Sequence, residues 1–282
     1  MEKIPCSIPL LTLNRRGELE RLLPQIVPFF DDVFIMDGNS TDGTVEYAQS
    51  LGVRVEKQFE TDTPNQRITD FGAMRAKLWA ASKHDWLFIL DSDEEVQLKT
   101  IDRVRTIVSE NASNTAYTMP VVTKLPDGRI VRYALYYPFR YIRVFKRSSG
   151  ISLGGRAVHE RFYVPDGIRT IDCSEPIIEP QPSAREWRVR QMKYIPLELK
   201  EMAHITWAHF WRWIVWYNLK NLLSQIVKAV VCSIRGLLTH EVALPWSYNV
   251  IFFEYRIRSM MANAAEWRRR RRAMGVVTTE AP

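Results

Sequence analysis

The stretch Trp86-Leu87-Phe88-Ile89-Leu90-Asp91-Ser92-Asp93 places two carboxylates directly after a short, fully apolar run. Such a run is typical of a strand that is buried in a sheet. Side chains two residues apart on an extended chain point to the same side, so Asp91 and Asp93 can act together. Because Mg²⁺ and Mn²⁺ prefer oxygen ligands beside substrate phosphates, this pattern favours a metal–diphosphate site. A solvated acidic turn without a ligand is the alternative.

A second acidic turn lies upstream and has the same layout. The apolar run 33–36 ends in Asp37, and the segment 38–44 that follows is rich in residues that begin helices. A helix is predicted over 45–51, and Gly52 stands directly after it, where glycine commonly ends a helix. The sequence therefore predicts a strand, a turn and a helix around Asp37.

These two segments belong to a longer alternation of strands and helices. Strands are predicted at 4–13, 33–36, 53–58 and 86–90, and helices at 17–26, 45–51 and 66–82. This order indicates an α/β fold with a mostly parallel sheet and helices on both faces. Ligands of such open sheets bind beyond the carboxyl ends of the strands, where Asp37, Asp91 and Asp93 are all expected.

Several stretches, in this order, resemble the family 2 glycosyltransferases of the Rossmann-like GT-A fold. They are Ser7-Ile8-Pro9 through Leu13-Asn14-Arg15, Ile35-Met36-Asp37-Gly38-Asn39-Ser40-Thr41-Asp42-Gly43-Thr44, Ala73-Met74-Arg75, and His84-Asp85-Trp86 through Asp91-Ser92-Asp93-Glu94. The resemblance covers about residues 4–165. It implies a nucleotide-sugar donor and a divalent metal, Mg²⁺ or Mn²⁺.

The resemblance also implies roles for single residues. Asp37 would contact the nucleotide base, Asp93 would ligate the metal on the diphosphate, and Asp91 would face the ribose or the sugar. Asn14 and Arg75 fall in matching stretches and are expected to bind the nucleotide. One position departs from the pattern, because many members carry a second Asp where this chain has Gly38.

The middle of the chain is expected to form the acceptor side. Runs 116–123 and 130–133 flank a Pro-Asp-Gly turn and predict a hairpin. The strand 140–147 that follows alternates basic and apolar residues. Its Arg143 either faces the pyrophosphate or belongs to a solvated edge strand, which basic residues protect against pairing.

Val158-His159-Glu160 completes the set of candidate residues, since related glycosyltransferases often carry this tripeptide after a strand like 143–145. An inverting transfer needs a base to take the proton of the acceptor hydroxyl, and Glu160 is the candidate. His159 would be a metal ligand or a phosphate donor. The alternative is a structural His beside a surface Glu.

The length and composition fit this interpretation. A chain of 282 residues, 46% hydrophobic and 25% charged, can bury a sizeable core. The three cysteines are far apart and form no metal-binding pattern, which favours a reducing compartment. We expect a catalytic domain at 1–180, a helical amphipathic region at 181–265, and a basic, flexible tail at 266–282.

The C-terminal segment 195–282 carries 12 Lys and Arg against 6 Asp and Glu, so most of the net charge of +7 resides there. Aromatic residues at 207–217 precede apolar residues at helical spacing, and five arginines follow at 268–272. This pattern favours an interfacial helix on an anionic membrane surface, whereas packing on the catalytic domain is the alternative. Nucleic acid is not expected as a partner, because no nucleic-acid-binding motif accompanies the arginines.

The sequence thus predicts a metal-dependent, inverting glycosyltransferase that moves a single sugar to a saccharide or lipid-linked acceptor. The alternatives are a sugar nucleotidyltransferase and a non-catalytic membrane-associated scaffold of the same fold. The N-terminus leads into a strand without a long apolar signal region, so a cytoplasmic protein, peripheral at the inner face of the cell membrane, is expected.

Overall fold

The computed structural model describes residues 2–135, 139–155, 160–193, 195–196 and 210–277. The chain divides into two compact units. The first comprises Met1–Val122 and Pro138–Pro180, and the second comprises Thr123–Tyr137 and Gln181–Pro282. The segment 123–137 thus belongs to the second unit, although both its neighbours in sequence belong to the first.

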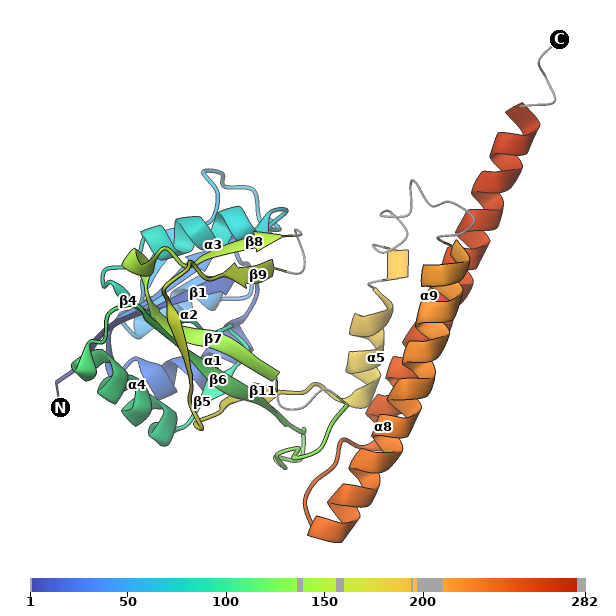
Figure 1. Cartoon of the computed structure of the whole chain (residues 1–282). Helices are drawn as coiled ribbons and strands as arrows, with labels where there is room; N and C mark the ends of the chain where they lie inside the picture. Colours follow the sequence, from blue (N-terminus) through green and yellow to red (C-terminus); the bar gives the residue numbers. More distant parts are fainter. Residues whose placement is uncertain (1, 136–138, 156–159, 194, 197–209, 278–282) are drawn as a thin grey trace. The chain divides into compact units, whose positions relative to one another are not determined.

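The first unit is built on a large sheet whose first half is parallel (Figure 1). Its strands lie in the order β3-β2-β1-β4, and all three pairings are parallel. Register aligns Thr12 with Asp37, and Asp37 with Lys57, so these strands end at one edge of the sheet. The strands are β1 (Ile4–Thr12), β2 (Phe30–Asp37), β3 (Arg54–Lys57) and β4 (Trp86–Phe88).

The second half of the sheet adds antiparallel pairs, with β7 between β4 and β6. On the far side of β6 lie β11 and then β5, and β10 pairs with β6 in parallel. A separate two-stranded sheet is formed by β8 and β9. The bounds are β5 (Glu95–Val96), β6 (Thr115–Lys124), β7 (Phe139–Lys146), β8 (Ser152–Gly155), β9 (Glu160–Tyr163), β10 (Arg169–Asp172) and β11 (Ile177–Pro180).

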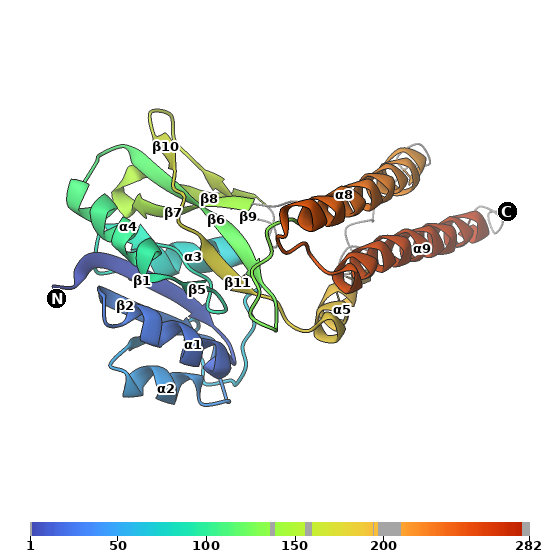
Figure 2. The same cartoon turned by 90° about the horizontal axis from the view of Figure 1, so that it is seen from below.

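Helices cover both faces of the sheet, as predicted (Figures 1 and 2). On one face, α1 (Arg16–Ile26), α2 (Thr44–Ser50) and α4 (Leu98–Glu110) bury their apolar side chains against β1, β2 and β4. On the other, α3 (Phe71–Ala80) packs with β8 and β9 over β2, β4 and β7. The alternation of inward side chains along each strand produces the two cores. The predicted α/β class is confirmed.

Two local predictions differ from the structure. The predicted helix 66–82 begins only at Phe71, because Asp70 is its N-cap and accepts a hydrogen bond from the backbone N–H of Ala73. The predicted hairpin after β6 closes at the Lys124–Ile130 bridge. Its second arm forms no strand, because the backbone N–H groups of Arg132 and Tyr133 donate to Val242 instead.

The second unit is helical. Its small core joins Leu125, Val131, Leu244 and Tyr248, and the helix α5 starts with a capping box between Ser183 and Glu186. The elements are α5 (Ala184–Met192), the π-helical η2 (Phe210–Tyr217), α8 (Asn218–Thr239) and α9 (Trp246–Val277). Because α9 runs on through 268–272, no helix end falls at the predicted start of a flexible tail at 266.

Among the described residues, one helical stretch, Val215–Thr239, is long and apolar enough to cross a membrane by length and composition. Buried helices of soluble proteins can pass the same test, but little of this stretch is buried. The finding therefore agrees with an apolar surface and does not by itself place the chain in a membrane.

Candidate active site

Asp37 ends β2 and organises the turn that follows it. Its side chain is only 3% exposed. One carboxylate oxygen accepts from the backbone N–H of Ser40 at 2.7 Å, and the other accepts from the hydroxyls of Ser40 and Thr12, each at 2.7 Å. Three donors therefore hold this carboxylate in one orientation at the edge of the sheet.

Asn14 connects the loop after β1 to the same turn. It has a left-handed φ of 52°, its backbone N–H donates to Ser40 Oγ at 2.7 Å, and its Oδ1 accepts from the N–H of Thr41 at 2.9 Å. Its Nδ2 donates to Asn65 at 2.7 Å. Asn14 thus ties three loops together, and its nucleotide-binding role stays a prediction.

Gly38 explains the departure from the family pattern. A Cβ atom there would lie 2.6 Å from the carbonyl oxygen of Gln66 and 2.9 Å from Gln58 Oε1. The backbone N–H of Gln66 donates to the Gly38 carbonyl at 2.8 Å, which fixes that close approach. The loop that ends at Gln66 therefore occupies the space that a second Asp would need.

A cavity of about 470 Å³ opens beside this turn, between α2, β3 and the loop that carries Asp62. Polar groups of the turn line it together with apolar Val45 and Val55. Its size and mixed lining are those of a site for a small ligand. The lining residues are Asp37, Asn39, Ser40, Thr41, Val45, Glu46, Gln49, Val55, Glu56, Lys57, Asp62 and Pro64.

The acidic turn after β4 lies two strands away from Asp37. Arg75 of α3 forms an ion pair with Asp91 at 3.0 Å, and Arg15 lies 3.9 Å from Asp93. Burial acts to raise the pKa of Asp91, but Arg75 and then Arg143 outweigh it, so this pKa is lowered. For Asp93 burial prevails over Arg15, and its pKa is raised. The two carboxylates of the triplet thus differ in their electrostatic surroundings.

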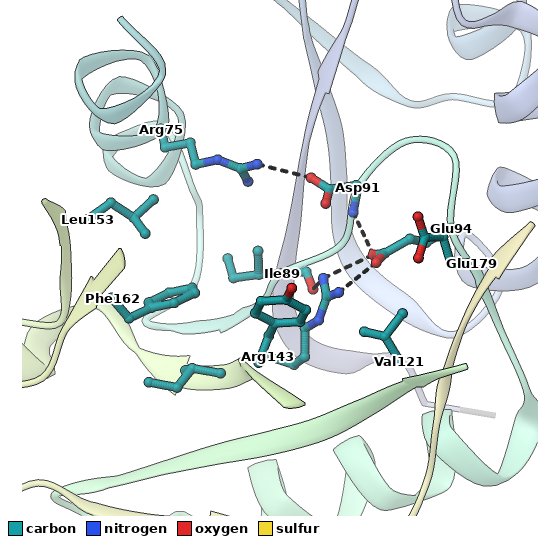
Figure 3. Close-up of a pocket in the computed structure, with 11 residues that line it drawn as sticks. Arg75, Ile89, Asp91, Glu94, Val121, Arg143, Leu153, Phe162 and Glu179 are labelled. Carbon is teal, nitrogen blue, oxygen red and sulfur yellow. Dashed lines mark hydrogen bonds and ion pairs between the residues drawn. The ribbon is translucent and has the colours of Figure 1, made fainter. Parts of the chain in front are cut away.

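Arg143 binds Glu94, the residue that follows the triplet (Figure 3). Its two terminal nitrogens lie 2.6 and 3.0 Å from the Glu94 carboxylate, and one also donates to the carbonyl of Ile89 at 3.1 Å. Glu94 Oε2 in turn accepts from the backbone N–H of Asp91 at 2.8 Å. Both partners are buried, and burial raises the pKa of Glu94 to about 7 although Arg143 opposes it. This pair fastens the acidic turn to β7.

A second cavity, of about 300 Å³, lies against the acidic turn over β4, β7, β6 and β11 (Figure 3). Carboxylates and guanidinium groups line one part of it and apolar side chains the rest. Its Glu179 comes from β11, and burial, then Asp93 and Asp91, raise the pKa of that carboxyl. The lining is Arg75, Ile89, Asp91, Glu94, Val121, Tyr141, Ile142, Arg143, Leu153, Phe162 and Glu179.

The structure brings six of the predicted residues to this edge of the sheet, and one of them is Asp93 in the acidic turn, 3.9 Å from Arg15. Asp37 and Asn14 share one turn, and Arg75, Asp91 and Arg143 line the cavity beside the acidic turn. His159 lies outside the described residues, and the side chain of Glu160, at the start of β9, is not described either. Nothing in the structure tests their predicted roles.

Sequence reasoning missed Glu94, Glu179 and Tyr141 as parts of the site. Glu94 directly follows the triplet, but its sequence neighbours Asp93 and Glu95 are also acidic, so nothing local marked it as the buried one. Glu179 and Tyr141 had no local signal either. They reach the cavity because β11 and β7 lie in the same sheet as β4.

A family comparison identifies this domain. The model of glycosyl transferase family 2 matches residues 7–164, which is more than half of the chain and contains both acidic turns. The chain belongs to glycosyl transferase family 2. This result, with the sheet order, confirms the predicted GT-A type of fold and the glycosyltransferase class of the domain.

Curated relatives match part of the chain. An uncharacterized glycosyltransferase of Rickettsia bellii is 29% identical over 132 residues, which are 46% of this chain and 42% of the relative. A TPR repeat-containing protein of Synechococcus elongatus is 25% identical over 170 residues, covering 60% of this chain and 38% of that protein. The chain therefore spans less than half the length of these relatives.

Solved structures of glycosyltransferases are also similar in part. S. aureus TarS 1–349 covers 96% of this chain and 92% of its own, with 11% identity and a TM-score of 0.44. Glucosyl-3-phosphoglycerate synthase from Mycobacterium tuberculosis, solved with Mn²⁺, UDP and glucosyl-3-phosphoglycerate, covers 44% of both chains, with 21% identity and a TM-score of 0.30. Scores this low carry no conclusion about ligands.

Proposed function

We propose that the chain transfers a single sugar, with inversion, from a nucleotide-sugar donor to a saccharide or lipid-linked acceptor. The observation that carries the proposal is the acidic turn Asp91–Asp93 at the carboxyl edge of a family 2 domain. The cavity of about 470 Å³ adjoins the Asp37 turn. The cavity of about 300 Å³ adjoins the acidic turn, over β7 and β11. A donor laid along this edge would have its nucleotide near Asp37, its diphosphate near Asp93 and its sugar at the second cavity.

The residues present fit a divalent metal at Asp93. In the described part of the chain no three His, Cys, Asp or Glu residues are gathered as a metal cage. Mg²⁺ does not need one, because it commonly binds through one or two carboxylates and completes its shell with water and substrate phosphates. Asp93 is partly exposed, and its carboxylate is not taken up by a close ion pair. A metal there, Mg²⁺ or Mn²⁺, would neutralise charge on the leaving diphosphate. His159 is retained as a second proposed ligand.

Proton transfer is assigned to the acceptor side. Glu160 is proposed as the base that takes the proton of the acceptor hydroxyl as its oxygen attacks the sugar carbon. Arg75 and Arg143 stay proposed as donor contacts. Their guanidinium groups are 3.0 Å from Asp91 and 2.6 Å from Glu94, so they also hold the turn in place. Preorganised positive charge of this kind favours a departing diphosphate.

The cell-envelope and membrane part of the proposal rests on the second unit. Its excess of basic residues, including the arginines at 268–272, favours contact with an anionic membrane surface. We infer a cytoplasmic enzyme, peripheral at the inner face of the membrane, that acts on a saccharide or lipid-linked acceptor of the cell envelope. Nucleic acid is not proposed as a partner.

The experiment is a hydrolysis screen of the purified chain against a panel of nucleotide sugars with Mn²⁺ or with a chelator. We expect one donor to be hydrolysed slowly in a metal-dependent way, because water can replace the acceptor. Loss of this activity in Asp93→Asn would link it to the acidic turn. Absence of hydrolysis and of nucleotide binding across the panel would refute the proposed function.

A further inference from the structure

The helix α8 exposes most of its large apolar side chains and buries a glutamine. Gln225 is 2% exposed and lies with Ala229 and Gly236 on the buried side. Leu237 and Leu238, in contrast, are 77% and 76% exposed. Helices of a soluble protein normally show the reverse arrangement. The exposed apolar residues of α8 are Leu219, Leu223, Ile226, Val227, Val230, Val231, Ile234, Leu237 and Leu238.

The neighbouring helix α9 packs against α8. Arg256 of α9 donates to Asn218 at 3.4 Å. Ser259 and Asn263 of α9 are buried as well, and Asn263 donates to Ser259 Oγ. Within the residues that the structure describes, the second unit therefore buries several polar side chains beside its small apolar core and leaves a wide apolar surface exposed.

Most of the exposed apolar residues lie on one face, which exposed Lys220 interrupts near its start. Positions 219, 223, 226, 230, 234 and 237 recur every three or four residues, which places them on one side of a helix. Lys228 and Arg235, seven residues apart, lie together along one flank of this face, and both are exposed. We call positions 219–238 of this side the apolar face of α8.

A bilayer matches this face and its flank. An apolar helix face with basic residues beside it is the pattern of helices that lie in the membrane interface. Trp216 and Tyr217, both exposed, stand at the start of the face, where aromatic rings favour the headgroup region. The basic flank complements anionic headgroups at the depth where the apolar face meets the acyl chains.

The position of Lys228 decides between lying in the membrane and crossing it. At about 1.5 Å per residue, Val215–Thr239 is long enough to span a hydrocarbon core of ~30 Å. Lys228 would then stand near the middle of that core, which is costly for an ammonium group. With the helix axis in the plane of the membrane, Lys228 and Arg235 both remain at the headgroups.

We propose that α8 lies in the plane of a lipid bilayer, with its apolar face among the acyl chains and its basic flank at the headgroups. This inference deepens the membrane part of the proposed function and rests on it, but it is independent of the reaction. The polar seam towards α9 stays covered in this arrangement, so the helix pair needs no rearrangement to bind.

The first test is flotation of the full chain with vesicles of phosphatidylcholine, alone or mixed with phosphatidylglycerol. Leu237→Gln, Leu238→Gln and Val227→Gln are combined in one variant, and Leu98→Gln on α4, which is about as exposed as Val227, is the control. We expect the triple variant to lose at least about tenfold in affinity for both vesicle types, because three apolar side chains leave the acyl region. The control should bind like the wild type.

A variant with Arg268–Arg272 changed to Gln separates this inference from simple charge attraction. It should lose much of the extra affinity for phosphatidylglycerol, of which Lys228 and Arg235 retain a part, and keep the affinity for phosphatidylcholine. Insertion of α8 would be refuted if the wild type does not bind phosphatidylcholine vesicles, or if the triple variant binds both vesicle types like the wild type. Electrostatic docking on anionic vesicles would remain possible in either case. Donor hydrolysis in lipid-free buffer should not change in the triple variant, so failure of the membrane inference and failure of the proposed reaction are distinguishable.

The second test addresses orientation. Cysteines that carry an environment-sensitive fluorophore replace Val227 or Lys228 in a Cys232→Ser background, in which the other two cysteines are buried. On vesicles, the label at 227 should shift to the blue and resist an aqueous quencher, whereas the label at 228 should stay accessible. Protection of both labels would indicate a spanning helix and overturn the in-plane arrangement.

Two further outcomes would also refute the proposal. If the triple variant melts at a lower temperature and binds vesicles normally, the apolar face packs against the chain itself. A second copy covers the face if wild-type protein sediments as a dimer without lipid, the triple variant sediments as a monomer, and neither protein binds phosphatidylcholine.

Discussion

The backbone leaves no room for a side chain at Gly38, because a Cβ there would lie 2.6 Å from the carbonyl oxygen of Gln66. We expect Gly38→Asp to destabilise the fold by about 1–3 kcal/mol, since a carboxylate would be forced against carbonyl oxygens. Gly17→Asp is the matched control, because a Cβ at Gly17 meets nothing within 4 Å. Denaturant unfolding measures both, and equal stability of the two variants would show that the loop ending at Gln66 yields without cost.

Asp93 is the residue that we propose as the metal ligand. Asp93→Asn should abolish turnover and remove the metal-dependent part of nucleotide binding, because an amide is a weaker ligand for Mg²⁺ than a carboxylate. The melting temperature should hardly change, since the side chain is 40% exposed and makes no close ion pair. Calorimetric titration with nucleotide, in Mn²⁺ and in chelator, provides the measurement, with Asp102→Asn on α4 as the control. Unchanged affinity in Mn²⁺ would contradict the assignment.

Two carboxylates compete for the role of base. Glu160 is the candidate from sequence, and Glu179 is the one that the structure places in the cavity beside the acidic turn. Replacing the true base by Gln should lower kcat by roughly 10²- to 10⁴-fold and leave donor affinity unchanged. The other replacement should cost much less. Single-turnover transfer with each variant decides, and near-normal rates in both would exclude both residues.

At the scale of elements, we expect the contact between α5 and α9 to weaken as the pH falls. Glu254 of α9 binds Arg188 of α5 at 2.5 Å and Arg258 at 2.7 Å. Hydrogen bonding from Arg188, opposed by burial and supported by Arg258, lowers the pKa of Glu254 from 4.5 to about 2. A carboxyl whose folded pKa is depressed stabilises the fold above the unfolded value and loses this contribution as pH falls to the folded one.

We therefore expect the wild type to be more stable than Glu254→Gln above about pH 4.5, and the difference to vanish towards pH 2. The arginines are half exposed, so added salt should shrink the difference. Thermal melts of both proteins across this pH range measure it. A difference that stays constant from pH 6 to pH 2 would show that another contact holds α5 on α9.

At the scale of the whole molecule, charge and apolar surface should make separate contributions to membrane binding. The segment 195–282 has an excess of six basic residues, 12 against 6. High salt should therefore release only part of the protein from anionic vesicles, because screening weakens attraction to headgroups but leaves apolar insertion in place. Cosedimentation over a range of salt concentrations provides the measurement. Complete release would assign the whole affinity to charge, and no release would assign it to the apolar face of α8.

Much of the parallel half of the first unit could be predicted from the sequence. Apolar runs that end in Asp37 and Asp91 mark two buried strands, and turn residues between them mark the helices, because burial and chain reversal leave local signals. The same signals locate both acidic turns and the amphipathic character of 219–238. The starts of helices are harder to predict. The helical pattern begins at residue 66, whereas α3 begins at Phe71, because Asp70 caps it.

Only the tertiary structure decided what those residues contact. Arg143 pairs with Glu94 because β7 joins β4 in the sheet, a pairing between segments about 50 residues apart that no local pattern encodes. Glu179 reaches the cavity for the same reason, through the place of β11 in the strand order. On α8, the spacing of apolar residues predicts a face, but only the structure shows that α9 packs on another side of the helix, where Arg256 donates to Asn218. Periodicity is a property of the chain alone, whereas burial is decided by whichever distant segment packs against it.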